Sequence, residues 1–334
     1  MVQRLGVVVI GVGLMGRRHA ENVQKSAEME LVAVVDARPE VAQAVSRDLG
    51  CEHWFTDATA ALRLPTCQAA IIATAAGTHA ELIELAAQHC RDVLCEKPLA
   101  LSLNDAQRAA TAMRRAGRQL QVGFMRRYDP GYAAAHALIA DGKIGRPLLF
   151  KALSRDRESG PSQASGGIFI DSAIHDFDLA RWLMGDEVSE VTALAAAAMD
   201  PDGEDDTGLV NLRFAAGALG AAEVFSQAGY GYDIRTEVVG SAGTLRIGSD
   251  AQRPLAVLTR EGAQTDFVGH FLDRFATAYE REVQDWARRM LSSEPAAVTA
   301  DDGIRALQIA LAAYTAAASG NAVRISPGAT LAAG

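Results

Sequence analysis

A lysine followed by proline is the first group of residues that could do chemistry. Glu96-Lys97-Pro98 follows the apolar run Val93-Leu94-Cys95, so Lys97 would lie at the carboxyl end of a buried strand. Open α/β sheets bind their ligands at that edge. Pro98 restricts the backbone of Lys97 and would orient its side chain, whose ammonium group can stabilise an anionic oxygen. The alternative is an ordinary exposed lysine in a loop.

An aspartate and a histidine further along the chain form the second group. If a helix begins near Asp171, then Asp171, His175, Asp178 and Trp182 recur on one of its faces. A carboxylate beside an imidazole can orient it and favour its charged form, as a general base requires when it takes a hydroxyl proton. In one alternative, Asp171 only caps the helix and His175 is a buried core residue. In another, His175, Asp176 and Asp178 bind a metal. No second His or Cys cluster accompanies them in the sequence, so we expect no bound metal.

A glycine-rich motif near the start of the chain predicts a nucleotide site. Gly11-Val12-Gly13-Leu14-Met15-Gly16 directly follows a predicted strand and opens a predicted helix. The first glycine permits a tight turn, the second allows a pyrophosphate to approach, and the third allows the helix to pack on the strand. The free amides of the helix would then bind the phosphates. The alternatives are a turn that binds nothing or one that binds FAD.

An acidic residue at the end of the next predicted strand favours NAD. Asp36 can accept hydrogen bonds from the adenosine ribose and would repel a 2′-phosphate, so NADP is less expected. Arg38 weakens this preference, because a guanidinium could help to hold that phosphate. His79 would line the cofactor, or it is a surface residue at a helix start. The residues expected to contact the cofactor are Gly11, Gly13, Leu14, Met15, Gly16, Asp36, Arg38, Thr74, His79, Glu96 and Lys97.

Short apolar runs alternate with helical stretches in the first third of the chain. The predicted strands cover residues 6–10, 31–36, 69–74, 93–96 and 120–122, and the predicted helices cover residues 16–26, 39–49, 78–89 and 102–116. Thr78-His79-Ala80-Glu81 predicts a capping box at a helix start. This α/β pattern predicts a Rossmann domain over residues 1–122, with a doubly wound parallel sheet.

Successive strands without intervening helices dominate the rest. Strands are predicted over residues 147–154, 188–197, 208–214, 219–226, 232–239 and 244–247, and helices over residues 129–140, 171–184, 268–291 and 301–318. This α+β pattern predicts a second domain over residues 123–334, built on a mainly antiparallel, open-faced sheet.

Composition narrows the classes of partner. The net charge of −9 and the lack of a Lys/Arg block argue against nucleic acid. No apolar run approaches the roughly 18 residues that a membrane helix needs, so we expect no membrane partner and a cytoplasmic location. The four cysteines include no C-x-x-C pair and are expected to be reduced, structural thiols.

Together these motifs resemble a known family. The glycine-rich motif, Glu96-Lys97-Pro98, Gly123-Phe124-Met125-Arg126-Arg127-Tyr128-Asp129 and residues 171–178 are similar to the family of glucose-fructose oxidoreductase, inositol dehydrogenase and MocA, and most of all to its bacterial inositol-type members. The resemblance implies a catalytic trio of Lys97, Asp171 and His175. It also implies that Met125, Arg126 and Tyr232 lie near a polyol, together with the trio, and that the open sheet forms a homotetramer.

The implied activity is the NAD-dependent oxidation of a secondary ring hydroxyl of a cyclitol, such as myo-inositol, to the ketone. The alternatives are a dehydrogenase of another sugar or of scyllo-inositol, and a non-catalytic NAD(H)-binding regulator. A short-chain dehydrogenase is disfavoured, because no Tyr is followed four residues later by Lys. Arg157 stands where inositol dehydrogenases commonly have Pro, and the loop of residues 159–167 is expected to decide which polyol binds.

Overall fold

The chain divides into two compact units. A computed structural model describes residues 4–157, 166–200, 203–248, 256–260, 262–265 and 268–325. The first unit contains Met1–Met125 and Tyr279–Arg305, and the second contains Arg126–Ala278 and Ala306–Gly334. The boundary expected after residue 122 therefore lies close to the first division. The return of Tyr279–Arg305 to the first unit is not signalled by any local pattern in the sequence.

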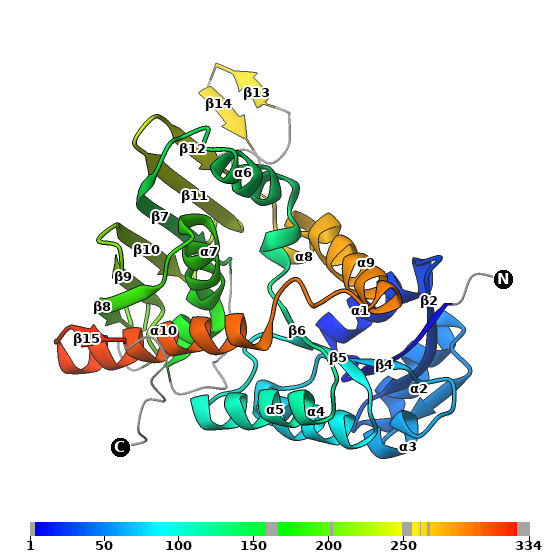
Figure 1. The fold of residues 1–334 in the computed structure, drawn as a ribbon. Coiled ribbons are helices and arrows are strands. Elements are labelled where there is room, and N and C mark those ends of the chain that lie inside the picture. Colours follow the sequence, from blue (N-terminus) through cyan, green and yellow to red (C-terminus); the bar gives the residue numbers. More distant parts are fainter. Residues whose placement is uncertain are drawn as a thin grey trace. The chain divides into compact units, whose positions relative to one another are not determined.

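The first unit contains the expected parallel sheet. Six strands lie in the order β3-β2-β1-β4-β5-β6, and every neighbouring pair is parallel (Figure 1). The strands are β1 (Leu5–Ile10), β2 (Met29–Val35), β3 (His53–Phe55), β4 (Ala69–Ile72), β5 (Asp92–Glu96) and β6 (Leu120–Gly123). The order reverses between β1 and β4, and doubly wound sheets bind ligands at such a point. Edge strand β3 was not predicted, because three residues are too few to show a pattern.

Helices and a buried core complete this unit. The helices are α1 (Leu14–Lys25), α2 (Pro39–Leu49), α3 (Ala58–Leu62), α4 (His79–Gln88), α5 (Leu103–Arg115) and α9 (Ala276–Ser292). Val7 and Val9 of β1 belong to one apolar cluster with Val23 of α1 and with Val283 and Trp286 of α9. This burial of a distant helix against the sheet explains why α9 belongs largely to the first unit.

The predicted capping box at α4 is wrong. Thr78 ends a 3₁₀ turn, η1 (Ala76–Thr78), and its backbone is helical, with φ −103° and ψ −6°. A capping threonine needs an extended backbone to reach the amides of the next turn. The Thr78 hydroxyl instead donates to the carbonyl oxygen of Ala75 at 2.8 Å.

The second unit is built on a seven-stranded sheet in the order β12-β11-β7-β10-β9-β8-β15. All neighbours are antiparallel except β7 and β10, so the prediction of a mainly antiparallel sheet is confirmed. The strands are β7 (Pro147–Arg155), β8 (Val188–Ala196), β9 (Thr207–Phe214), β10 (Leu219–Phe225), β11 (Asp233–Gly240), β12 (Thr244–Ile247) and β15 (Val323–Arg324). Buried and exposed residues alternate along β9, as expected when only one face of a sheet is covered.

Helices of the second unit are α6 (Pro130–Ala140), α7 (Ile174–Met184), α8 (Phe271–Arg274) and most of α10 (Ala300–Ser319). A separate hairpin joins β13 (Ala256–Thr259) and β14 (Gly262–Thr265). The single helix predicted over residues 268–291 is divided between α8 and α9. None of the helices that the structure describes is long and apolar enough to cross a membrane.

Asp206, the last residue of the acidic run Glu204-Asp205-Asp206 between β8 and β9, has a local structural role. Asp206 accepts hydrogen bonds from the amides of Ala198 and Met199 at 3.0 and 2.7 Å. One side chain thereby closes the connection between the two strands.

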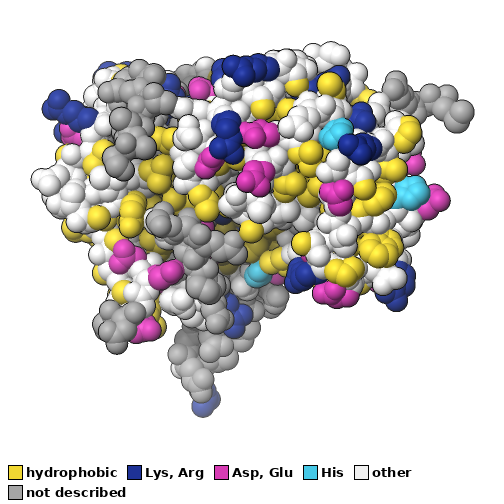
Figure 2. All heavy atoms as spheres, turned by 90° about the horizontal axis from the view of Figure 1, so that it is seen from below, with side chains coloured by type: hydrophobic (Ala, Val, Ile, Leu, Met, Phe, Trp, Pro, Cys, Tyr) yellow, Lys and Arg dark blue, Asp and Glu magenta, His cyan; other side chains and the backbone are white. Residues whose placement is uncertain are grey.

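On the face seen in Figure 2, basic and acidic side chains of the described residues are interspersed among apolar ones.

Candidate functional site

Each of the three glycines of the motif lacks a side chain for a different structural reason. Gly11 has a φ of +81°, and a Cβ there would lie 2.6 Å from Thr74 Cγ2. A Cβ at Gly16 would lie 1.6 Å from the carbonyl oxygen of Gly11, so helix α1 packs directly on the turn. A Cβ at Gly13 would meet nothing within 4 Å, because open space lies in front of it. This is the arrangement that the motif predicts for a turn approached by a phosphate group.

A cavity of about 820 Å³ opens at this turn. Its lining includes Gly11, Gly13, Asp36, Arg38 and Thr74. Gly13 is the N-cap of α1 and offers no side chain to the amides of the first helical turn. Such amides and the helix dipole favour an anion, so the residues present fit the pyrophosphate of a dinucleotide. Leu14 is largely exposed beside them, whereas Met15 is half-buried.

Asp36 is held in place at the edge of this cavity. Its carboxylate accepts hydrogen bonds from the amide of Val12 at 3.2 Å and from the amide of Arg38 at 3.1 Å. The Arg38 guanidinium also donates to it, with Nε 3.3 Å from Oδ1. The acid expected to bind a ribose is therefore oriented by the glycine-rich turn itself, and Arg38 is already paired with it.

Lys97 lies directly after β5 and is half-buried. The preceding Glu96 is buried, and its Oε1 accepts a hydrogen bond from Nε2 of His19 at 2.7 Å. Burial opposes the charge on Glu96, but the His19 hydrogen bond and nearby positive charges hold the pKa of this carboxyl below its ordinary value. The contact of Glu96 with the cofactor stays a prediction, and its carboxylate binds a histidine of α1. The sequence carries no signal that distinguishes His19 from any other histidine on a buried helix face.

His79 is buried, so the alternative of a surface residue is wrong. Its Nδ1 lies 2.8 Å from the carbonyl oxygen of Pro98, and its Nε2 lies 3.1 Å from that of Thr74. Burial lowers the pKa of the imidazole, which favours the neutral ring. Both ring nitrogens face carbonyl oxygens of the main chain, and one of these belongs to Thr74, which lines the cavity.

Asp171 and His175 lie in the second unit, Asp171 in a π-helical turn and His175 in the first turn of the helix that follows it. Phe169–Ala173 forms a π-helical turn, and α7 begins only at Ile174. The π turn inserts one residue per turn, and such turns are frequent at functional sites. Asp171 is half-buried and His175 is buried. They remain about one turn apart, as predicted, although Asp171 is not the cap of a regular helix.

The metal alternative fails at two of its three proposed ligands. Asp176 pairs with Arg126, with Nη1 2.6 Å from Oδ1, and Asp178 pairs with Arg127 through two hydrogen bonds of 2.8 and 2.5 Å. Both carboxylates are thus occupied by guanidinium groups. Among the described residues, no group of three or more His, Cys, Asp or Glu side chains is placed so that it could hold a metal ion.

Arg126 and Tyr232, two of the residues expected near a polyol, are buried within the second unit. The exposed fraction is 3% for Arg126 and 4% for Tyr232, and Arg126 Nη1 donates a hydrogen bond to the hydroxyl oxygen of Ser154 at 3.3 Å. Ser154 donates to Asp176 at 2.7 Å and completes this polar network. Met125, the third, is buried in the first unit. Residues 158–165, most of the loop expected to select the polyol, lie outside the described residues.

Comparisons with known proteins identify both units. Residues 5–124 match the oxidoreductase family's NAD-binding Rossmann fold, and residues 136–325 match its C-terminal alpha/beta domain. The chain is 36% identical to scyllo-inositol 2-dehydrogenase (NAD(+)) of Bacillus subtilis, over 97% of each protein. It is also 36% identical to myo-inositol 2-dehydrogenase of Thermotoga maritima, over 93% of this chain and 95% of that protein.

A solved structure shows the same fold. The myo-inositol dehydrogenase of Lactobacillus casei, crystallised with NAD(H) and myo-inositol, has a TM-score of 0.90 and 29% identity, over 99% of each chain. Full-length similarity to several dehydrogenases and matches to both family domains lead to one conclusion. The chain belongs to the oxidoreductase family of glucose-fructose oxidoreductase, inositol dehydrogenase and MocA, whose N-terminal domain is an NAD-binding Rossmann fold.

Proposed function

We propose that this protein oxidises a secondary ring hydroxyl of an inositol to the ketone, with NAD as the hydride acceptor. The observation that carries the proposal is an open glycine-rich turn that follows one strand of the parallel sheet, while Lys97 follows another strand of the same sheet. The chain is also similar over nearly its full length to inositol dehydrogenases. Lys97 follows β5, two strands from β1, and both strands end at the same edge of the parallel sheet.

Each proposed catalytic residue has one role. His175 accepts the hydroxyl proton, and Asp171 orients the imidazole and supports its positive charge. Lys97 donates a hydrogen bond to the same oxygen and stabilises the alkoxide as the carbon–hydrogen bond breaks. NAD supplies the acceptor for the departing hydride, and a carbonyl group forms on the ring. Gly11, Gly13, Leu14, Met15, Gly16, Asp36, Arg38 and Thr74 form the proposed cofactor site.

Formation of NADH is the direct test. The purified protein is supplied with NAD and with myo-inositol, scyllo-inositol, glucose or an open-chain polyol, and the absorbance of NADH is followed. We expect turnover with cyclitols and much less with the other compounds. Turnover confined to glucose would assign the protein to another sugar. NAD binding with no turnover on any compound would favour a regulator.

Cofactor choice gives a prediction at Asp36. Replacement of Asp36 with serine removes the carboxylate that faces the cavity and frees Arg38 from its ion pair. We expect the affinity for NAD to fall by about tenfold, which corresponds to the loss of one charge-assisted hydrogen bond, and the affinity for NADP to rise. Titration of both cofactors by fluorescence measures the ratio. An unchanged ratio would remove Asp36 from the ribose site.

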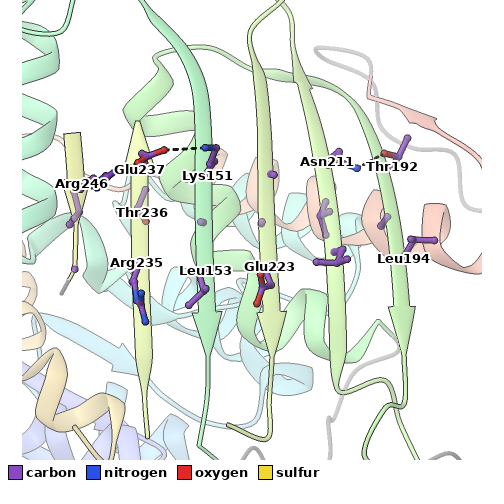
Figure 3. A pocket seen from close by; sticks show the side chains of 18 of the residues that line it. Lys151, Leu153, Thr192, Leu194, Asn211, Glu223, Arg235, Thr236, Glu237 and Arg246 are labelled. Carbon is purple, nitrogen blue, oxygen red and sulfur yellow. Dashed lines mark hydrogen bonds and ion pairs between the residues drawn. The ribbon is translucent and has the colours of Figure 1, made fainter. Parts of the chain in front are cut away.

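We also propose that the uncovered face of the second unit's sheet joins copies of this chain into a homotetramer. A hollow of about 1130 Å³ lies on that face, lined by side chains of strands β7 to β12 (Figure 3). Leu194 and Leu209 are partners on adjacent strands and are 69% and 50% exposed. Charged side chains such as Lys151, Glu223 and Arg246 line other parts of the hollow, and exposed apolar residues beside polar ones are a combination found at interfaces.

Replacement of Leu209 with arginine tests this interface. A charge placed at the centre of an apolar contact loses its hydration without a partner, so we expect the protein to sediment as smaller species. The control is Leu138→Arg, on a similarly exposed leucine of α6 that lies outside the hollow. An unchanged sedimentation coefficient for Leu209→Arg would exclude this face.

A cytoplasmic location, which the composition predicts, is part of the same proposal.

A further inference from the structure

We propose that two buried histidines, His19 and His79, are positioning residues for Lys97. The inference rests on the proposed function, in which Lys97 stabilises the alkoxide. His19 binds the side chain of Glu96, the residue before Lys97, and His79 lies against the carbonyl group of Pro98, the residue after it. Lys97 is therefore held from both sides by groups that do not themselves belong to the proposed catalytic trio.

The His19 contact fixes the residue before Lys97. His19 is fully buried, and its Nε2–H donates to Glu96 Oε1 at 2.7 Å. The second carboxylate oxygen of Glu96, Oε2, accepts a hydrogen bond from the backbone amide of Lys97 at 3.3 Å. One carboxylate thus joins the imidazole to the main chain of Lys97. Because a buried hydrogen bond to a charged group is strong, this connection restricts the start of the loop that carries Lys97.

Two further contacts restrict the movement of the His19–Glu96 pair, one at each of its side chains. A Cβ at Gly123 would lie 3.1 Å from Glu96 Oε2, so the glycine of β6 provides the space that the carboxylate fills. The ring of Tyr279 meets the imidazole of His19 edge to face, with the ring centres 6.1 Å apart. Packing and hydrogen bonding therefore both set the orientation of the His19–Glu96 pair.

The His79 contact fixes the residue after Lys97. Its ring lies between the carbonyl oxygens of Pro98 and Thr74, and a neutral imidazole donates its single N–H to one of them, which for support of the Lys97 loop is Pro98, through Nδ1. Thr74 follows β4 and lines the nucleotide cavity. His79 begins α4, whereas His19 belongs to α1, the helix that opens at Gly13. Two different helices of the Rossmann domain therefore support the Lys97 loop, and one of them is the helix proposed to bind the phosphates.

Matched variants at His19 provide the main experiment. His19→Phe fills the same space without a donor, whereas His19→Gln keeps an N–H close to the position of Nε2. We expect His19→Phe to lower kcat at saturating NAD and myo-inositol by roughly tenfold to a hundredfold, the scale of a misplaced catalytic group. We expect His19→Gln to restore most of kcat and both variants to bind NAD within about twofold of the parent, as one hydrogen bond outside the cavity should not alter it.

Val23→Ala is the control for a purely structural effect. Val23 lies one helical turn after His19 and is buried in the core of the same unit. This variant should lower the melting temperature and leave kcat unchanged at 25 °C. Equal losses of kcat in His19→Phe and Val23→Ala would overturn the inference, and so would a His19→Gln variant no more active than His19→Phe.

A second pair of variants keeps the test independent of how His19→Phe folds. His79→Asn retains a donor near the position of Nδ1 and should be more active than His79→Phe. Equal kcat in the two would overturn the role of His79. Lys97→Ala separates this inference from the proposed function. If Lys97→Ala keeps full activity, the proposed catalytic role fails; if it is inactive while His19→Phe and His79→Phe are fully active, only the positioning role fails.

Discussion

Lys97→Ala is expected to lower kcat for inositol oxidation by about a hundredfold to a thousandfold, the scale seen when one donor to a developing oxyanion is removed. Lys97 directly follows β5 at the ligand-binding edge of the sheet, and its main-chain amide donates a hydrogen bond to Glu96. A side chain that acts on the reacting oxygen contributes mainly in the transition state, so the affinity for NAD should change little.

Steady-state rates at saturating NAD and inositol measure this effect, and fluorescence titration with NADH measures binding. The control is Lys143→Ala, which removes an exposed lysine in the turn before β7 and should keep full activity. A Lys97→Ala protein that loses NAD affinity as strongly as turnover would identify Lys97 as a cofactor ligand. Full turnover would exclude it from the chemistry.

The first unit could be predicted from sequence because its signals are local. Its buried parallel strands are short apolar runs, and two glycines of the turn, Gly11 and Gly16, stand where the surrounding atoms leave no space for a side chain. Helix α2 has the predicted bounds, since Pro39 begins it and Gly50, with a left-handed backbone, ends it. The place of α9 could not be predicted, because it depends on contacts between residues far apart in the sequence.

The site was predictable in its residue types more than in its contacts. The spacing of Asp171 and His175 identified the segment, but the π turn before α7 follows from packing that no periodicity shows. Arg126 is an expected polyol contact and Asp176 a ligand only in the metal alternative, and the structure pairs the two with each other. Charged residues 50 positions apart give no sequence signal of an ion pair, since the pairing depends on the fold around them.

Arg126→Met is expected to cost about 3–5 kcal/mol of unfolding free energy, because it leaves a buried carboxylate without its partner. The side chain of Asp176 is fully buried, and that of Arg126 is 3% exposed. Equilibrium unfolding in urea measures the loss. The control is Arg17→Met, which breaks exposed ion pairs with Glu21 and Asp48 and should cost no more than about 1 kcal/mol. A loss of similar size in both variants would show that the buried pair contributes no more than a surface one.

The pH dependence of this variant follows from Asp176. Burial raises the pKa of its carboxyl, while the Arg126 charge and the Ser154 hydrogen bond oppose that shift, so the pKa rises further once Arg126 is removed. Between the unfolded and folded pKa values, the folded chain then holds a proton that the unfolded chain releases, and stability falls as the pH rises. The deficit of Arg126→Met relative to the parent should therefore be larger at about pH 8 than at about pH 5. A deficit that is independent of pH would mean that Asp176 stays ionised in the folded variant, beside another cation, and would contradict the expected rise of its pKa. The double variant Arg126→Met with Asp176→Leu has no carboxyl at this position, so the pH dependence that we assign to Asp176 should be absent from it.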